Sequence, residues 1–337
     1  MGADVKGNRM EKVFFIREFD KNESIDFLPC ANVMVGTYKT NIEKKLKRLL
    51  IKNGWSKCVF EKELKDFDLL AYNLIIVEEI FSWNPIFLLE YLREKNPKAC
   101  IVYWLRNTLF LEKYKNGISR ENIEAFLDTA KRYNFQIASF DKGDCTAYGM
   151  LYVPQCIIRE PGLFKRVDKR ASVLKYDLFW AGKDKKRVGF LEKIKRYCDE
   201  VGLTYKFAIY PDKKMKYSEE LSPFLLQRGN LPYCDIIKID LESRAILDIV
   251  QKGQQGLTYR PIESLFLRKK LITTYEGIKQ YDFYRAANIL VVNENNISEI
   301  KEFLKIPYED VPLSIVEKYT FNGMVEQMHH DIVLIEN

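Results

Sequence analysis

The segment 251–264 (QKGQQGLTYRPIES) gathers residue types that can bind a phosphate and a sugar hydroxyl. Its glycines, glutamines and threonine form a flexible polar loop, and Arg260 and Pro261 begin a predicted helix. Arg260 can pair with a phosphate, and Glu263 in the first helical turn can accept hydrogen bonds from a ribose diol. The alternative, that Glu263 is only a favourable first-turn acid, leaves the polar loop before it unexplained. The candidate ligand-binding residues here are Gln255, Gly256, Leu257, Thr258, Arg260 and Glu263.

A second anion-binding candidate is the segment 179–187 (FWAGKDKKR), where a predicted strand runs into a glycine, a group of cations and a helix. Glycine lets a ligand approach the backbone, and the start of the helix presents free N–H groups and a positive dipole end to an anion. Such a turn can hold a diphosphate without a metal, although the G-x-x-x-x-G-K-[ST] pattern of a Walker loop is missing. A basic solvated turn is the equally supported alternative. The candidate residues are Gly182, Lys183, Lys185 and Arg187.

Two adjacent acids, Glu78 and Glu79, directly follow the apolar run that ends at Val77. A carboxylate at the carboxyl end of a strand can act as a general base if burial or a charged neighbour raises its pKa. We therefore treat both as candidate catalytic residues. The alternative is a structural acid pair in a loop or at a helix start, and the sequence alone favours that alternative.

The chain has only two histidines, both near its C-terminus, so acid–base chemistry falls to carboxylates, Lys, Tyr or Cys. Asp20, Glu23 and Asp26, in an early polar segment, are rival candidates for a general base. Asp141 and Asp144 are instead predicted to cap a helix.

The composition favours neither a metal site nor a nucleic-acid ligand. Seven scattered cysteines without a C-x-x-C pair predict reduced thiols in a cytoplasmic protein. The net charge is 54 − 47 = +7, with bases and acids interleaved, which predicts a solvated surface and leaves a peripheral contact with the anionic inner face of a membrane open. No signal peptide and no run of about 18 apolar residues is present, so no membrane-spanning helix is expected.

Short apolar runs alternate with amphipathic segments along the chain, and Gly54 and Gly202 are predicted to end helices. Strands are predicted at 68–77, 99–105, 136–140, 151–153, 176–181, 204–209, 245–250, 270–273 and 288–292, and helices at 40–52, 85–93, 121–133, 186–201, 260–267, 298–304, 313–319 and 321–330. This alternation predicts βαβ units and parallel sheets.

The expected fold class is therefore α/β, with two Rossmann-like domains facing a cleft. The predicted linker is 159–175, which contains a Pro-Gly pair and a run of charges. The expected domains are 1–160 and 171–320, followed by a C-terminal helix at 321–337. Ligands in such folds bind at the carboxyl ends of strands, so the cleft between the domains is the expected site.

Several segments resemble, in the same order, bacterial glycosyltransferases of the GT-B fold, and more narrowly those of lipopolysaccharide or capsular polysaccharide biosynthesis. They are 139–149 (SFDKGDCTAYG), 176–187 (YDLFWAGKDKKR), 243–249 (SRAILDI), 253–264 (GQQGLTYRPIES) and 269–274 (KKLITT). The resemblance covers roughly residues 136–310, and the first 130 residues show no such likeness.

The resemblance implies a first domain that binds a saccharide or lipid-linked saccharide acceptor. It also implies a second domain that binds a nucleotide-sugar donor, UDP-linked by preference, with no separate cofactor. Glu263 matches the glutamate that binds the nucleotide ribose, and Arg260 and the cations near Lys185 match residues that hold the diphosphate in place of a metal. The final helix is implied to cross back to the first domain. Many retaining members carry E-x7-E, but the second position here is Leu271, so retention or inversion stays open.

Two hypotheses follow for the function. The first is a metal-independent glycosyltransferase, of hexosyltransferase type, that works on bacterial surface polysaccharides. The second is a non-catalytic two-domain protein that binds a nucleotide or a saccharide. A Rossmann dehydrogenase is disfavoured because no predicted strand is followed by G-x-G-x-x-G.

Overall fold

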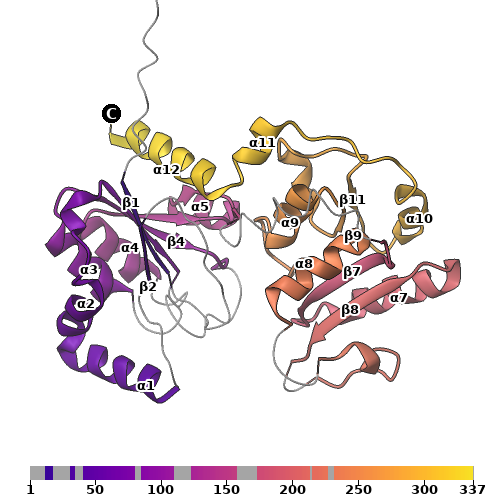
Figure 1. Ribbon diagram of the computed structural model, residues 1–337, viewed down its shortest axis with the longest axis horizontal. Coiled ribbons are helices and arrows are strands. Elements are labelled where there is room, and N and C mark those ends of the chain that lie inside the picture. The colour runs from indigo at the N-terminus through magenta and orange to yellow at the C-terminus, as the bar shows by residue number, and fades with distance from the viewer. Residues whose placement is uncertain are drawn as a thin grey trace, which may run out of the picture. The chain divides into compact units, whose positions relative to one another are not determined.

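The structure, a computed structural model, describes residues 12–17, 31–34, 41–79, 85–109, 123–157, 173–212, 215–226 and 231–336. These residues form two compact α/β units, each built on a parallel sheet (Figure 1). The first unit contains the described residues up to Phe140 and Asp144–Tyr152, and the second contains Asp141–Gly143 and the described residues from Val153 onward. The predicted α/β class with two Rossmann-like domains is confirmed.

The sheet of the first unit has six strands, all parallel, in the order β2-β1-β3-β4-β5-β6. The strands are β1 (Val13–Arg17), β2 (Ala31–Met34), β3 (Leu74–Glu78), β4 (Cys100–Leu105), β5 (Phe135–Ser139) and β6 (Leu151–Tyr152). β1, β3 and β4 are almost continuously apolar and buried, as expected of parallel strands covered on both faces. Because parallel strands end at the same edge, the residues that follow β3 and β4 lie near each other.

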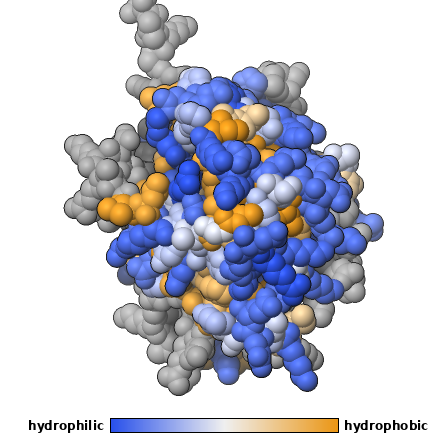
Figure 2. All heavy atoms as spheres, turned by 90° about the vertical axis from the view of Figure 1, so that its right-hand side faces the viewer, coloured by the Kyte–Doolittle hydropathy of each residue, from blue (hydrophilic) through white to orange (hydrophobic). Residues whose placement is uncertain are grey.

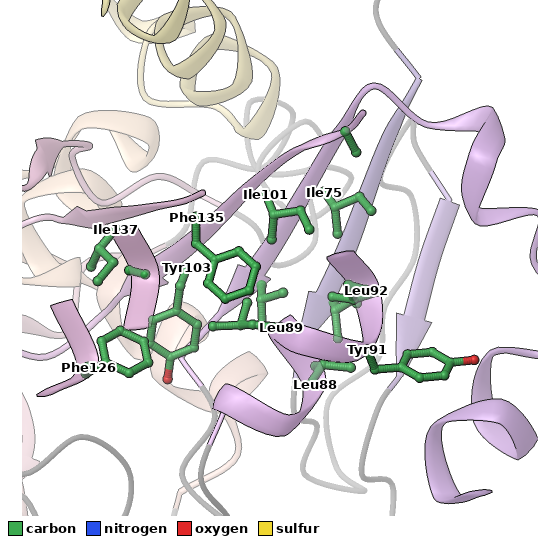
Figure 3. Close-up of a cluster of buried hydrophobic side chains, with 14 of the residues drawn as sticks. Ile75, Leu88, Leu89, Tyr91, Leu92, Ile101, Tyr103, Phe126, Phe135 and Ile137 are labelled. Carbon is green, nitrogen blue, oxygen red and sulfur yellow. The ribbon is translucent and has the colours of Figure 1, made fainter. Parts of the chain in front are cut away.

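The described helices of the first unit supply the other half of its core. They are α1 (Asn41–Leu50), α2 (Ser56–Leu64), α3 (Ile86–Lys95), α4 (Ile123–Arg132) and α5 (Lys142–Tyr148), whose first two residues are grouped with the second unit. Leu89 and Leu92 of α3 lie in one buried cluster with Ile75 of β3 and Ile101 of β4 (Figure 3). This packing holds β3 and β4, and the candidate acids lie at the carboxyl end of β3.

Gly54 interrupts helical geometry as the sequence predicts. Its φ of +86° is a left-handed conformation that a residue without a Cβ adopts readily. The turn Ile51–Trp55 then leads into α2, which the sequence did not predict. Only Phe60 and Leu64 of α2 are fully buried, so its apolar pattern is too weak to recognise without the fold.

The sheet of the second unit has five parallel strands in the order β11-β10-β9-β7-β8. The strands are β7 (Tyr176–Lys183), β8 (Tyr205–Tyr210), β9 (Ser243–Asp248), β10 (Lys270–Thr273) and β11 (Ile289–Val291). All five overlap strands predicted from the sequence. β7, β9 and β10 are neighbours, so the loops that follow them share one edge of the sheet.

The described helices of the second unit are α7 (Val188–Val201), α8 (Tyr233–Leu241), α9 (Tyr259–Leu267), α10 (Ile300–Phe303), α11 (Leu313–Glu317) and α12 (Phe321–Glu336). Gly202, with φ +73°, ends α7 as predicted. The face seen in Figure 2 is mainly hydrophilic, with hydrophobic groups scattered across it. Within the part of the chain that the structure describes, no helix is long and apolar enough to cross a bilayer.

Several predicted boundaries need correction. The strand predicted at 68–77 begins only at Leu74, because Asp68 accepts a hydrogen bond from the N–H of Leu70 and holds a short 3-10 turn. The strands β1 and β2 and the helix α8 were not predicted. Most of the predicted linker lies at 158–172, outside the described residues.

Candidate functional site

The candidate site of the second unit lies at the carboxyl edge of its sheet. The loop after β7 carries the predicted cations, and the loop after β9 is the polar segment that leads into α9. Arg187 connects the two loops, because its Nη1 donates a hydrogen bond of 2.8 Å to the carbonyl of Ile249. The two segments singled out in the sequence are therefore neighbours in the fold.

Gly182 provides the space for this connection. A Cβ at this position would lie 2.9 Å from Nη2 of Arg187 and 3.2 Å from the ring of Trp180. The guanidinium of Arg187 stacks over Trp180 at 5.2 Å and also donates to the carbonyls of Lys183 and Asp184. Burial lowers the pKa of Arg187, but a guanidinium stays charged at any ordinary pH. Its positive charge is thus fixed between the loops.

The start of α7 differs from the prediction. Two of its N–H groups, those of Arg187 and Val188, donate to Oδ1 of the buried Asp184, at 3.1 and 3.2 Å. These groups are not free for an external anion, so that part of the prediction is wrong. Asp184 lies three residues before Arg187, so its carboxylate occupies the position at the start of the helix where a phosphate would bind.

The cations Lys183 and Lys185 remain exposed at the same edge. Lys185 has a φ of +43°, and its N–H donates to Asp212 at 3.0 Å. The pKa of Lys185 is lowered, first by desolvation and then by the charges of Arg187 and Lys183. Mutual repulsion of this kind indicates a site of positive potential that an anion would relieve.

The polar loop 251–258 is held in place by hydrogen bonds from outside it. The N–H of Gln255 donates to Oδ2 of Asp141 at 2.8 Å, and the hydroxyl of Tyr275 donates to the carbonyl of Gln255 at 2.6 Å. Gly256 pairs with Asp141 in a single antiparallel bridge, and Leu257 is buried. The loop is therefore a fixed structure.

Thr258 occupies the position just before α9 but does not cap the helix. Its hydroxyl donates to Oδ1 of Asp248 at 2.9 Å, and Thr273 donates to Oδ2 of the same carboxylate at 3.0 Å. Burial raises the pKa of Asp248, which both hydroxyls oppose. The side chain of Thr258 therefore makes no capping hydrogen bond to α9.

Arg260 is the second residue of α9 and Glu263 is the fifth, so Glu263 lies beyond the first turn in which the sequence placed it. The two side chains form an ion pair along the helix. Nη1 of Arg260 lies 2.5 Å from Oε2 of Glu263, and its guanidinium also binds both oxygens of Asp240 in α8, at 2.9 and 2.5 Å. Burial would lower the pKa of Arg260, but the two carboxylates more than offset it and raise the pKa. The charge of Arg260 is matched within the protein, so its contact with a phosphate stays a prediction.

In the first unit, Glu78 ends β3 and is buried between two arginines. Its carboxylate lies 2.9 Å from Nε of Arg17, in β1, and 2.5 Å from Nη1 of Arg106, after β4. Arg106 also stacks over Trp104 at 4.4 Å. Two cations therefore pair with the carboxylate of Glu78.

Glu79 has a different environment from its neighbour. Its Oε2 accepts hydrogen bonds from the N–H groups of Arg106 and Asn107 at 2.9 Å and from Nδ2 of Asn107 at 3.1 Å. Its Oε1 is buried and has no hydrogen-bond partner among the described residues. Burial raises the pKa of Glu79 from 4.5 to about 7, although the hydrogen bonds oppose this. This geometry suits a general base.

The other acids have structural roles where the structure describes them. Asp141 caps α5 as predicted, because its Oδ1 accepts the N–H of Gly143 at 2.9 Å. Asp144 instead binds the N–H of Leu109 at 2.9 Å, so its predicted capping role is wrong. The rival acids are outside the described residues; they are Asp20, Glu23 and Asp26.

The sequence did not single out Asp240, Asp248, Arg17 or Arg106. The first two are acids within otherwise apolar segments, which is a usable signal for a buried, paired carboxylate. The two arginines gave no signal, because only the pairing of β1, β3 and β4 brings them to Glu78. In the described part of the chain, no group of three or more His, Cys, Asp or Glu residues could hold a metal ion.

No protein-family model matches this chain, and no curated protein matches its sequence. Solved structures match its fold over nearly its whole length. An α-glucosyltransferase in complex with UDP and a 13-mer DNA containing a central A:G mismatch has a TM-score of 0.54 at 11% identity, covering 96% of this chain and 100% of that one. AviGT4, a glycosyltransferase involved in avilamycin A biosynthesis, has a TM-score of 0.54 at 11% identity, covering 95% and 96%.

A sucrose-phosphate synthase from Thermosynechococcus elongatus has a TM-score of 0.53 at 12% identity, covering 96% of this chain and 88% of that one. At such identities the likeness shows the fold alone. The chain therefore has the two-domain GT-B fold of nucleotide-sugar glycosyltransferases.

Proposed function

We propose that this protein is a glycosyltransferase that moves a sugar from a nucleotide-diphosphate sugar, UDP-linked by preference, to a saccharide or lipid-linked saccharide. The GT-B fold supports this assignment, and the motif resemblance supports acceptors of the bacterial surface polysaccharide type. The observation that carries the proposal is the hydrogen bond from Arg187 to Ile249, which joins the cationic loop to the polar loop before α9.

The second unit would bind the donor through these two loops. Lys183 and Lys185 supply exposed positive charge for the diphosphate, and the positive dipole end of α9 adds to it. Glu263, four residues into the helix, is the proposed partner of the ribose diol, and Arg260 holds its carboxylate in position. Fixed positive charge at this edge would stabilise the diphosphate as it leaves the sugar.

The first unit would bind the acceptor. Glu79 is the better candidate for its general base, because Oε1 is unpaired among the described residues and its pKa is raised to about 7. Glu78 would instead hold Arg17 and Arg106 in position beside it. Of the two predicted catalytic acids, Glu79 would then be the general base and Glu78 a positioning residue.

Calorimetric titration of UDP into the wild type and Glu263→Gln tests the donor site. The glutamine keeps a hydrogen-bond acceptor for Arg260 but loses the charge that strengthens bonds to ribose hydroxyls, so we expect affinity to fall about ten-fold or more. Glu299→Gln, at an exposed position of the same unit, is the control and should bind normally. Equal UDP affinity in wild type and Glu263→Gln would contradict the assignment of Glu263.

Release of free UDP from a UDP-sugar distinguishes an enzyme from a binding protein. We expect slow hydrolysis without an acceptor and faster release with a saccharide acceptor. A protein that binds UDP-sugars but never releases UDP would instead be the non-catalytic binding protein that the sequence left open.

A further inference from the structure

Tyr275 reaches the polar loop from a part of the chain that the sequence did not single out. It follows β10 by two residues and comes directly before the short 3-10 helix Glu276–Gln280. Its hydroxyl donates a hydrogen bond of 2.6 Å to the carbonyl of Gln255, in the loop after β9. Because β9 and β10 are paired in the sheet, this bond joins the loops that follow two neighbouring strands.

Gly277 leaves the space that the ring of Tyr275 occupies. A Cβ on Gly277 would lie 2.5 Å from the hydroxyl oxygen of Tyr275, 2.6 Å from its Cζ and 2.8 Å from its Cε2. Such contacts are far shorter than the separation of about 3.5–4.0 Å at which carbon atoms pack, so any side chain at position 277 must push the phenol aside. The phenol therefore packs directly on the backbone of Gly277, and its position depends on this glycine.

The backbone of Tyr275 is tied to the start of α9. Its N–H donates to Oγ1 of Thr273 at 3.1 Å, and Thr273 in turn donates to Oδ2 of the buried Asp248 at 3.0 Å. Oδ1 of Asp248 accepts the hydroxyl of Thr258, the residue before α9. Burial raises the pKa of Tyr275, so its hydroxyl keeps the proton that it donates to Gln255. The hydroxyl is thus placed and protonated before any ligand arrives.

Gln255 is held on both sides of its backbone, whereas its side chain is not bound. Its N–H donates to Asp141 at 2.8 Å, and its carbonyl accepts the hydroxyl of Tyr275. The residue is exposed, and its carboxamide makes no hydrogen bond to another residue that the structure describes. Gly143 makes room for this carboxamide, because a Cβ there would lie 3.1 Å from Oε1 of Gln255. A carboxamide offers two donors and an acceptor, so one on a fixed backbone can bind the hydroxyls of a ligand.

We propose that Tyr275 and Gly277 form a clamp that aims the carboxamide of Gln255 at hydroxyl groups of the nucleotide sugar. Tyr275 is a positioning residue: it acts through the backbone of Gln255, and its ring rests on Gly277. A side chain that is already in place loses less entropy when a ligand binds, so the clamp would tighten donor binding without adding charge. The identity of the ligand rests on the proposed function, whereas the clamp itself can be measured without a ligand.

Hydrogen–deuterium exchange of the ligand-free protein tests the clamp. Tyr275→Phe removes the hydroxyl, and Gly277→Ala displaces the ring that carries it. In both variants we expect faster exchange at the amide of Gly256, which shares a peptide group with the carbonyl of Gln255. Tyr284→Phe is the matched control, because Tyr284 is half-buried in the same segment and its hydroxyl makes no hydrogen bond within the described residues. Unchanged exchange in Tyr275→Phe would overturn the proposal.

A double-mutant cycle shows whether the clamp acts through Gln255. We expect Tyr275→Phe to weaken the affinity for UDP-glucose, measured by calorimetry, about three- to ten-fold, and Gln255→Ala to weaken it at least as much. In the Gln255→Ala background, Tyr275→Phe should have little further effect, because the side chain that it positions is gone. A purely structural role would instead lower the affinity by the same factor in both backgrounds, and that result would contradict the positioning role.

Thermal unfolding checks that each variant is folded, and Tyr284→Phe should bind UDP-glucose like the wild type. A wild type that binds neither UDP nor UDP-glucose would contradict the proposed function and the donor role of the clamp together. Normal binding by the wild type with equal effects of Tyr275→Phe in both backgrounds would contradict the clamp alone.

Discussion

Glu263 accepts a hydrogen bond of 2.5 Å from Arg260, one turn before it in α9. The same guanidinium also binds both oxygens of Asp240, so one arginine pairs with two buried acids from two helices. The side chain of Glu263, which we propose binds the ribose, therefore cannot rotate freely. Its carboxylate is positioned before any nucleotide arrives, which reduces the entropy lost on binding.

Arg260→Met should destabilise the fold strongly, because it leaves Asp240 and Glu263 buried without a cation. We expect a loss of about 3–5 kcal/mol in the free energy of unfolding, measured by urea denaturation at neutral pH. Arg268→Met is the control: its pair with Asp310 is exposed on both sides and should contribute about 1 kcal/mol or less. Similar losses in both variants would show that Asp240 and Glu263 do not rely on Arg260.

Gly182→Ala should disturb the connection between the two donor loops. Its methyl group would meet Nη2 of Arg187 at 2.9 Å, so the guanidinium must move away from the carbonyl of Ile249. We expect a loss of about 1–3 kcal/mol in stability and weaker UDP binding by calorimetry. Gly189→Ala, within α7, has no atom within 4 Å of the new Cβ and should stabilise the protein by about 0.5–1 kcal/mol. If both alanines bind UDP alike, the space at Gly182 is unimportant.

The stability of the protein should depend on the protonation of Glu79. Its folded-state pKa of about 7 lies above its ordinary value of 4.5, so the folded state holds the proton more tightly. The contribution to stability is full below pH 4.5, is lost as pH rises towards 7, and is constant above it. Over that window the wild type should lose about 3 kcal/mol relative to Glu79→Gln, by urea denaturation at several pH values. A constant difference between the two proteins would show that the pKa of Glu79 is not raised.

Asp141→Asn should loosen the loop before α9. Oδ1 of Asp141 caps α5 and its Oδ2 accepts the N–H of Gln255, so an amide can keep only one of these two bonds. We expect a loss of about 1–2 kcal/mol in stability and faster amide exchange at Gln255, measured by hydrogen–deuterium exchange. Asp310→Asn, at an exposed position, is the control. Unchanged exchange at Gln255 would mean that Tyr275 alone fixes the loop.

Much of the fold could be predicted from the sequence because its strands are short apolar runs with clear ends. The run that ends at Val77 and the run at 245–250 both proved to be parallel strands followed by polar residues. α8 was missed because it mixes apolar and charged residues without a clear face. β1 was missed although residues 13–16 form a short apolar run of the same kind as the predicted strands. Local pattern is a weak guide where tertiary burial decides the structure.

The sequence by itself determined where the two polar loops lie, since each follows an apolar strand and precedes a helix. The tertiary structure alone decided which of their side chains are already paired. Gln255 and Asp141 are 114 residues apart, and Arg260 and Asp240 are 20 residues apart, so no local pattern reveals these contacts. Glu78 and Glu79 are adjacent in sequence and could not be told apart there. In the fold, Glu78 pairs with two arginines, whereas Glu79 has a buried oxygen without a hydrogen-bond partner among the described residues. Charge state depends on burial and on neighbours from distant strands, and only folding brings these together.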